Sequence, residues 1–118
     1  MNVPLADITF TIDGDIVVAS VIGEIDMSNA LDLGDALAAR LTNESRGLVL
    51  DLTACEYVDS AGIHVLYELQ ERLRNRGLDL RIVVGVDAAI APALEIADVP
   101  RAMGSADNVQ AAIASLRG

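Results

Sequence analysis

The sequence predicts one α/β domain spanning residues 1–118 and built on a mixed sheet. Short runs rich in Val, Ile and Leu indicate buried strands, and longer segments with apolar residues three or four apart indicate helices. After the first two runs, strands and helices alternate, which favours parallel pairing through right-handed crossovers. We therefore expect about four to five strands, beginning with an antiparallel hairpin, and about four helices.

The expected hairpin occupies the first part of the chain. Ile8–Ile12 alternates apolar and polar residues, as a half-buried strand does. Ile16–Ile22 is a second strand rich in Val and Ile, and Asp13-Gly14-Asp15 between them is a turn signal. Two strands joined by an Asp-Gly turn are typical of an antiparallel hairpin.

A first helix is expected soon after the second strand, which ends at Gly23-Glu24-Ile25-Asp26. Ser28 is a plausible N-cap, because its hydroxyl can accept a hydrogen bond from an N–H group at a helix start. Apolar residues then recur with helical spacing up to about Leu41. These residues are Ala30, Leu31, Leu33, Ala36, Leu37, Ala38 and Leu41.

The clearest pattern is a buried strand over Leu48–Leu52 followed by a helix from about Ala61 to Asn75. Glu68 and Arg72 are spaced to form an ion pair on the helix surface, and Gly77 is expected to end the helix. The apolar stripe of the helix consists of Leu66, Leu69 and Leu73, with Gly62 and Val65 beside it.

The last third predicts a strand over Leu80–Val84 and a helix within residues 87–97. Because proline disrupts a helix interior, that helix either bends at Pro92 or begins near it. Val99–Met103 is interpreted as a short edge strand, and Ser105 as the cap of a last helix. The inner face of this helix would carry Val109, Ile113 and Leu116.

Composition restricts the class of protein. With 53% hydrophobic residues the chain can form one core, and its net charge of −10 disfavours binding to nucleic acid or anionic membranes. No apolar run approaches the ~20 residues of a membrane span, and the first residues lack the pattern of a signal peptide. The single cysteine, Cys55, is interpreted as a small buried hydrophobe. We expect a cytoplasmic protein whose partner carries basic patches.

Ser60 is the strongest candidate for a functional residue. A strand that runs into a helix through Asp59-Ser60-Ala61-Gly62 places one hydroxyl at the first helical turn. Unpaired amide groups and the positive end of the macrodipole make that position favourable for a phosphate. The alternative is that Ser60 is an ordinary helix cap, since serine and aspartate both have that role.

Catalytic and metal sites are not indicated. The G-x-S-x-G pattern of a serine hydrolase is absent, and His64, the single histidine, has no evident third residue to orient it. One histidine and one cysteine do not make a metal site. An acyl carrier protein also bears a serine after an aspartate at a helix start, but carriers are all-helical and this chain has strands. We expect no enzyme activity, no catalytic residue, no metal and no cofactor.

Two motifs together indicate a family. Gly23-Glu24-Ile25-Asp26 ends an early strand, and Asp59-Ser60-Ala61-Gly62 opens a helix after a later strand. From about Ile8 to Leu116, the chain resembles the STAS-domain anti-sigma factor antagonists of bacteria, which implies a single STAS domain. The chain departs from the pattern at Ala61, where many members have Ser or Thr, and at Pro92, where relatives often have a basic residue.

The resemblance implies a partner switch. In that family the unmodified protein binds an anti-sigma factor that is also a serine kinase, and so frees a sigma factor. The kinase phosphorylates the motif serine, here Ser60, which ends binding, and a serine phosphatase restores it. By this resemblance Asp26 lies in a loop that faces the kinase, and Ile63 and His64 lie on the partner-facing side. The expected partner-binding residues are Asp26, Asp59, Ser60, Ala61, Gly62, Ile63 and His64.

A second hypothesis belongs to another functional class. STAS domains also serve as binding modules of transporter or scaffold complexes, without phosphorylation. In that case Ser60 is a helix cap and the helix face is a constitutive docking surface. Replacement of Ser60 by alanine distinguishes the two hypotheses, because it removes regulation only if the hydroxyl is modified.

Overall fold

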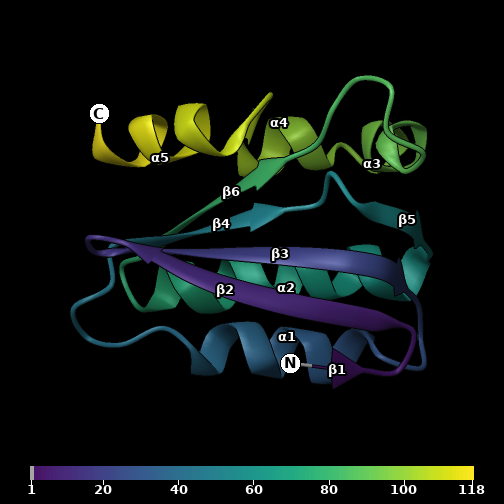
Figure 1. Ribbon diagram of the computed structural model, residues 1–118, viewed down its shortest axis with the longest axis horizontal. Coiled ribbons are helices and arrows are strands. Elements are labelled where there is room, and N and C mark those ends of the chain that lie inside the picture. The colour runs from purple at the N-terminus through teal and green to yellow at the C-terminus, as the bar shows by residue number, and fades with distance from the viewer. Residues whose placement is uncertain (1) are drawn as a thin grey trace.

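The computed structural model describes residues 2–118 and confirms an α/β fold with a mixed sheet (Figure 1). Within these residues there are seven strands and five helices, slightly more than expected. The strands are β1 (Asn2–Val3), β2 (Ala6–Asp13), β3 (Ile16–Ile25), β4 (Gly47–Asp51), β5 (Cys55–Val58), β6 (Asp79–Val83) and β7 (Ser105–Ala106). The helices are α1 (Ala30–Ala39), α2 (Ser60–Asn75), α3 (Ala91–Ile96), α4 (Val99–Met103) and α5 (Val109–Arg117).

The sheet has the strand order β1-β2-β3-β4-β6-β7. β2 pairs antiparallel with β1 and β3, whereas β4, β6 and β7 continue the sheet in parallel, which confirms the hairpin and the crossovers. β3 is long enough to pair with two strands on one side. β4 pairs with Ile16–Ser20, and β5, which was not expected, pairs with Gly23–Ile25. The residue before α2 is thereby brought beside the end of β3.

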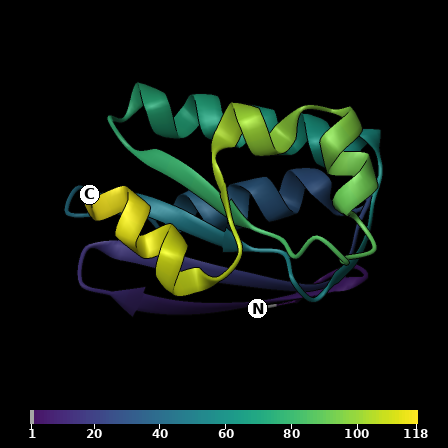
Figure 2. The same ribbon diagram turned by 90° about the horizontal axis from the view of Figure 1, so that it is seen from above.

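Helices cover the two faces of the sheet unequally (Figures 1 and 2). α1, α2, α3 and α4 contribute to the main core on one face, whereas α5 covers a smaller core on the other. Consecutive residues of a strand point to opposite faces, so Val17 belongs to the main core and Val18 to the smaller one. The smaller core consists of Ile16, Val18, Val49, Val83, Ala112 and Ile113.

Helix α2 follows its sequence pattern closely. The three leucines of the expected stripe are buried in the main core together with Val65, and Gly62 is buried as well. The helix ends at Asn75 with Arg76 as its C-cap, and Gly77 follows as the expected stop signal with a φ of +75° that suits glycine. Leu78 N then donates to Leu73 O at 2.8 Å. The stripe therefore fixes which face of α2 is left to solvent.

The cap expected for α1 is wrong. Asn29, and not Ser28, precedes the first helical residue, because Ser28 belongs to a turn in which its hydroxyl donates to Asp26. Leu31 also lies away from the core with 70% of its surface exposed, whereas Leu33 and Leu37 are fully buried.

Pro92 lies in the first turn of α3, which confirms the second of the two alternatives. A proline at that position loses no intrahelical hydrogen bond, because the first amide groups of a helix have no partner in it. Ile90 and Leu94 are buried, and Ala97 is half-buried after the helix end.

The strand expected over Val99–Met103 is wrong, because these residues form helix α4. Val99 and Met103, four residues apart, are both buried, which is helical spacing. The chain enters α4 through Asp98, whose φ of +63° reverses its direction after α3. The edge strand is instead β7, which pairs with Ile82 and Val83.

The cap expected at Ser105 is also wrong, since Ser105 belongs to β7. Asn108 caps α5, and its Oδ1 accepts a hydrogen bond from Ala111 N at 2.8 Å. Ile113 is buried on the inner face of α5, with Val109 and Leu116 packed beside it.

Candidate functional site

Helix α2 begins at Ser60 because Asp59 caps it. The Asp59 backbone is extended, and its Oδ1 accepts a hydrogen bond from Gly62 N at 2.9 Å. The Asp59 carbonyl accepts the first intrahelical bond from Ile63 N at 3.0 Å. Asp59 therefore satisfies one of the amide groups that a helix start leaves unpaired.

Ser60 is exposed as the first residue of α2. Its hydroxyl makes no hydrogen bond to any residue that the structure describes, so it is not the cap of the helix. The amide groups of Ser60 and Ala61 lie at the positive end of the helix macrodipole. The position therefore offers an accessible hydroxyl next to backbone groups that favour negative charge.

The turn after β3 lies against this helix start. Asp59 N donates to Ile25 O at 3.2 Å, and Asp59 Oδ2 accepts from Met27 N at 3.3 Å. Asp26 Oδ1 accepts from both the N and the Oγ of Ser28, at 2.8 and 2.6 Å. The two sequence motifs thus meet, and both carboxylates shape the backbone around Ser60.

Asn29 holds this turn in place, a role that the sequence analysis missed. Its side-chain amide donates to Pro4 O at 2.5 Å and Glu24 O at 2.7 Å, and its Oδ1 accepts from Asp26 N at 3.0 Å. Asn29 is 1% exposed and is the only buried polar side chain in the described part of the chain. Its position just before a helix resembles an ordinary cap, so the sequence carried little signal of the other contacts.

Gly62 allows α2 to approach the ends of β3 and β5. A Cβ atom there would lie 2.7 Å from Val58 Cγ2 and 2.9 Å from Ile25 Cγ2. Gly62 is buried, so it supports the surface around Ser60 and does not form part of it. Of the other expected partner-binding residues, Ser60 and His64 are exposed, and the rest are half-buried. The half-buried residues are Asp26, Asp59, Ala61 and Ile63.

The ion pair expected between Glu68 and Arg72 is wrong. Glu68 Oε1 lies 2.7 Å from His64 Nε2, one turn earlier on α2. Arg72 instead pairs with Asp35 of α1 at 3.1 Å. Tertiary contact between α1 and α2 thus provides Arg72 with a different carboxylate, and His64 points toward Glu68.

Exposed apolar side chains surround the helix start. Met27 in the turn after β3 is 82% exposed, and Tyr57 in β5, two residues before Asp59, is 48% exposed. Leu31 of α1 borders a shallow groove between α1 and α2 that Val65 and Glu68 also line. Exposed apolar side chains on these adjoining segments can provide contacts for a protein partner.

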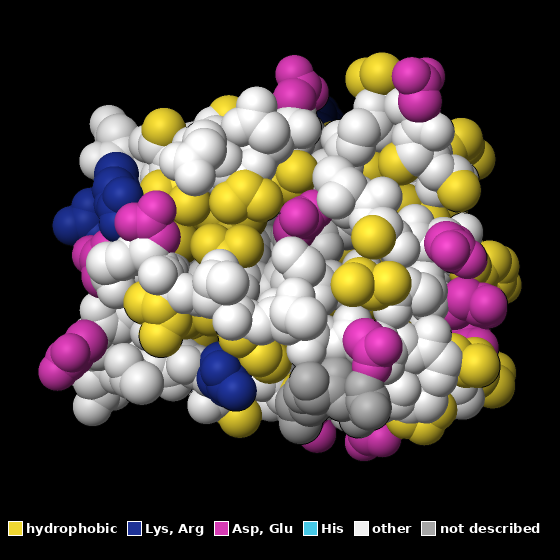
Figure 3. Space-filling view, viewed as in Figure 1, with side chains coloured by type: hydrophobic (Ala, Val, Ile, Leu, Met, Phe, Trp, Pro, Cys, Tyr) yellow, Lys and Arg dark blue, Asp and Glu magenta, His cyan; other side chains and the backbone are white. Residues whose placement is uncertain are grey.

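Charge is divided between the two ends of the parallel strands. We call one of them the Ser60 end, where β3 and β5 finish and α2 begins; it carries Glu24, Asp26, Glu56 and Asp59. Seven of the eight arginines lie toward the opposite end of the parallel strands, which we call the arginine end and which also carries Asp13, Asp15 and Asp79. These are Arg40, Arg46, Arg72, Arg74, Arg76, Arg81 and Arg117. In Figure 3, acidic and hydrophobic side chains alternate along the right-hand side, where β5 and α3 lie in Figure 1.

The described residues do not assemble a catalytic group around Ser60. His64 Nε2 is engaged by Glu68, and no hydrogen bond joins His64 to Ser60 within residues 2–118. No cluster of three metal-binding side chains occurs in the same part of the chain. Cys55 is buried in β5, and burial raises the pKa of its thiol, which keeps it in the unreactive protonated form.

Residues 7–112 match the family model of the STAS domain. The chain belongs to the STAS domain family. This match covers most of the 118 residues and includes both motifs and all of α2. Among curated proteins, no sequence matches this chain.

Solved structures share the STAS fold over nearly the whole chain. An anti-sigma factor antagonist from Mycobacterium paratuberculosis is 24% identical, with a TM-score of 0.83 and 100% of both chains covered. The Bacillus cell fate determinant SpoIIAA in its phosphorylated form is 12% identical, with a TM-score of 0.64 and coverage of 93% of this chain and 99% of that one. A sulfate transporter family protein from Wolinella succinogenes is 21% identical, with a TM-score of 0.65 and coverage of 91% and 88%.

At these sequence identities the similarity shows the STAS fold alone. The role of this chain has to be inferred from its own residues. The neighbours include both a protein solved in a phosphorylated form and a transporter-family protein. No helix in residues 2–118 is both long and apolar enough to cross a membrane.

Proposed function

We propose that this STAS domain is an anti-sigma factor antagonist controlled by phosphorylation of Ser60. In the unphosphorylated form it binds an anti-sigma factor serine kinase and frees a sigma factor. Phosphorylation of Ser60 by that kinase ends binding, and a serine phosphatase restores the starting state. The observation that carries this proposal is the exposed Ser60 hydroxyl, which has no structural task because Asp59 caps the helix.

The helix start accommodates a phosphate without loss of fold. The phosphate adds about −1.5 to −2 charges at pH 7, and the amide groups and macrodipole of α2 favour that charge. Asp59 already uses its carboxylate oxygens on Gly62 N and Met27 N, so the cap does not depend on Ser60. We expect the backbone to change little when Ser60 is modified.

The effect of the phosphate falls on the partner. A kinase surface that contacts the neutral hydroxyl must desolvate the new charge, and a few kcal/mol of lost complementarity reduces affinity about 100-fold or more. Half-buried Ile63 and exposed Met27 and Tyr57 provide apolar contact around Ser60. The carboxylates of the Ser60 end favour a partner with basic patches.

The surface around Ser60 also bears on enzyme activity and on contact with nucleic acid or membrane. The protein acts in the cytoplasm as a binding partner and has no catalytic activity of its own, since none of residues 2–118 offers Ser60 an activating base. It makes no direct contact with nucleic acid or membrane, because its formal net charge is −10 and the Ser60 end is acidic.

The second candidate function is a constitutive STAS module of a transporter or scaffold complex. The similarity to a sulfate transporter family protein favours it. In that case the exposed apolar residues of the Ser60 end are a permanent docking surface and Ser60 is never modified. The free Ser60 hydroxyl argues against this candidate, because the cap role that it assigns to Ser60 belongs to Asp59.

The deciding experiment incubates the purified protein with ATP and a lysate of the source organism, and locates phosphate by mass spectrometry. We expect phosphate on Ser60, none on the Ser60→Ala variant, and unchanged labelling of Ser105→Ala, which alters an exposed serine in β7. An unlabelled protein in a lysate that phosphorylates a control substrate would favour the constitutive module.

A further inference from the structure

The position beside β5 in the sheet holds no strand. β4 and β5 follow one another along the same side of β3, and β5 has no second neighbour among the described residues. β6, the neighbour of β4, ends at Val83, whose carbonyl accepts a hydrogen bond from Leu52 N at 2.9 Å. The chain then turns at Gly85, where Ala88 N donates to Gly85 O at 3.0 Å, and runs to α3, away from β5 (Figure 1).

The free edge of β5 is accessible. Thr53 and Glu56 are exposed, and Tyr57 is 48% exposed. An open depression of about 410 Å³ lies near the start of this edge, between Thr53, the turn at residues 85–88 and Asp107. A strand edge without a neighbour presents backbone N–H and C=O groups to which an added strand can bond. An extended segment of another molecule therefore finds both room and hydrogen-bonding groups here.

The surroundings of this edge are acidic. Glu24 and Glu56 are exposed on β3 and β5, and Asp87 and Asp107 line the depression. None of these four carboxylates lies within ion-pair distance of an arginine in residues 2–118. Val86, which also lines the depression, is 87% exposed. The edge is thus complementary to a segment that carries lysine or arginine together with apolar residues.

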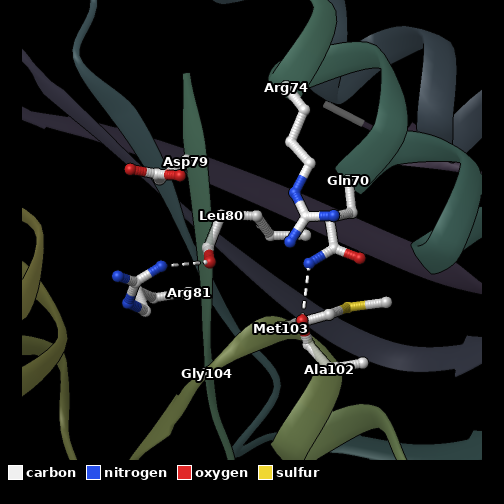
Figure 4. A pocket seen from close by; sticks show the side chains of 8 residues that line it. All are labelled: Gln70, Arg74, Asp79, Leu80, Arg81, Ala102, Met103 and Gly104. Carbon is white, nitrogen blue, oxygen red and sulfur yellow. Dashed lines mark hydrogen bonds between the residues drawn. The ribbon is translucent and has the colours of Figure 1, made fainter. Parts of the chain in front are cut away.

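β6 also has a free edge, but its surroundings differ (Figure 4). β7 pairs only with Ile82 and Val83, so the part of β6 before them has no neighbouring strand among the described residues. Gln70 Nε2 donates to Ala102 O at 2.7 Å and joins α2 to α4 beside this edge, and Arg74 extends from α2 toward the same place. Side chains and positive charge therefore disfavour a basic segment at β6, whereas the edge of β5 is open and acidic.

We propose that the free edge of β5 binds an extended, basic segment of a protein partner by strand addition. Main-chain hydrogen bonds to β5 hold the segment, and its basic side chains lie beside Glu56 and Asp87. Its apolar side chains contact Tyr57 and Val86. Because Ser60 lies two residues after the end of β5, the segment adjoins the surface proposed to change on phosphorylation, but its binding does not require phosphorylation.

The test is an NMR titration of the ¹⁵N-labelled protein with a blocked peptide of alternating arginine and valine, at constant ionic strength. We expect saturable shifts at residues 53–58 and 85–88, and none at residues 79–81 on the edge of β6. A peptide of alternating glutamate and valine should not bind, because its charge has the same sign as that of the edge. Shifts that do not saturate, shifts centred on another strand edge, or equal binding of the two peptides would overturn the proposal.

Backbone pairing is tested with two N-methylated forms of the arginine–valine peptide. Successive N–H groups of a strand point to opposite edges, so methyl groups on one set of alternate residues remove the donors that face β5, and methyl groups on the other set remove donors that face solvent. One form should therefore bind at least about tenfold more weakly than the other. Equal affinities of the two forms would mean that the peptide binds by charge alone, which would overturn strand addition.

A pair of variants locates the binding site. Glu56→Arg should weaken binding of the arginine–valine peptide at least about tenfold, because it replaces an attractive charge beside the segment by a repulsive one. Glu44→Arg is the matched control, since it makes the same change at an exposed residue between α1 and β4. Equal affinities of the two variants, both shown to be folded by thermal unfolding, would contradict the proposal. The titration involves no kinase, so its failure leaves the proposal for Ser60 standing, and an unphosphorylated Ser60 leaves this one standing.

Discussion

Helix α2 joins two ends of the molecule that use charge differently. At the arginine end, Arg72 pairs with Asp35 and Arg76 donates to Ala38 O and Leu41 O, so both side chains are engaged within the chain. At the Ser60 end, Asp26 and Asp59 accept hydrogen bonds from backbone and hydroxyl groups and have no basic partner among the described residues.

Both arrangements suit the helix macrodipole, which favours anions at a helix start and cations at its end. The difference lies in what remains for other molecules. The arginine end binds its own α1 to α2, whereas the Ser60 end keeps a free hydroxyl, exposed apolar side chains and uncompensated negative charge. At the Ser60 end the turn after β3 and the cap of α2 are hydrogen-bonded within the chain and the Ser60 hydroxyl is not. Ser60 is therefore suited to modification without loss of fold.

The largest effect is expected at Asn29. Asn29→Ala leaves Pro4 O, Glu24 O and Asp26 N without their partner, and unpaired buried groups cost about 1–3 kcal/mol each before relaxation. We expect the free energy of unfolding to fall by about 3 kcal/mol, measured by urea denaturation. Asn108→Ala, which removes the exposed cap of α5, should cost about 1 kcal/mol. An equal loss of unfolding free energy in the two variants would show that the buried hydrogen bonds of Asn29 do not hold the turn before α1.

The second-largest effect is expected from a negative charge introduced at position 60. Ser60→Glu should reduce affinity for the kinase that phosphorylates Ser60 about 100-fold, or about 2.7 kcal/mol, measured by calorimetry. Ser60→Gln is the matched control, because it has nearly the same size and no charge, and it should bind more tightly than Ser60→Glu. Thermal unfolding of both variants should stay close to that of the parent protein. A similar loss of affinity in both variants would assign the effect to size and not to charge.

Gly62→Ala should destabilise the Ser60 end by about 1–2 kcal/mol. The new Cβ meets Val58 and Ile25 side chains, and overpacking of this kind outweighs the gain in helix propensity. Gly85→Ala is the control, since no heavy atom lies within 4 Å of a Cβ built there. Chemical denaturation of both variants gives the comparison, and a Gly62→Ala protein as stable as Gly85→Ala would contradict the close approach of α2 to β3.

The smallest effect is expected for substitutions at the two ends of α2, which differ in how much they contribute to stability. Asp59→Ala should cost about 1 kcal/mol because it removes the cap of α2, whereas Arg74→Gln at the other end should change stability by less than about 0.5 kcal/mol. Asp59→Asn keeps the acceptor oxygen on Gly62 N and should retain most of the stability. Denaturant midpoints measure all three variants, and an Asp59→Ala protein no weaker than Arg74→Gln would mean that the cap is dispensable.

Several elements were predictable because their signals are local. The hairpin depends on an Asp-Gly turn, and the course of α2 depends on a stripe of leucines and a terminal glycine. The cap of α1 was not predictable in the same way, because Ser28 and Asn29 are both good capping residues. Asn29 contacts Pro4 and Glu24, which only the folded chain brings near it.

Short segments were the main source of error. Val99–Met103 has the composition of a strand, yet it forms α4 because burial of Val99 and Met103 on one side requires helical spacing. β5 has only four residues, and its pairing with the far end of β3 decides its structure. In such segments the propensity of each residue is weaker than the energy of its tertiary contacts.

The sequence by itself determined the fold class, the position of Ser60 at a helix start and the family motifs, since these depend on periodicity and on neighbours along the chain. Only the tertiary structure decided that Asp59 and not Ser60 caps α2, that the turn after β3 lies beside it, and that Asn29 holds the turn. The turn is placed by hydrogen bonds between residues far apart in sequence, Met27 with Asp59 and Asn29 with Pro4, whose partners no local pattern specifies. The cap bond from Gly62 N to Asp59 is local, but the sequence offers both Asp59 and Ser60 as capping residues, and only the structure shows which of them accepts it.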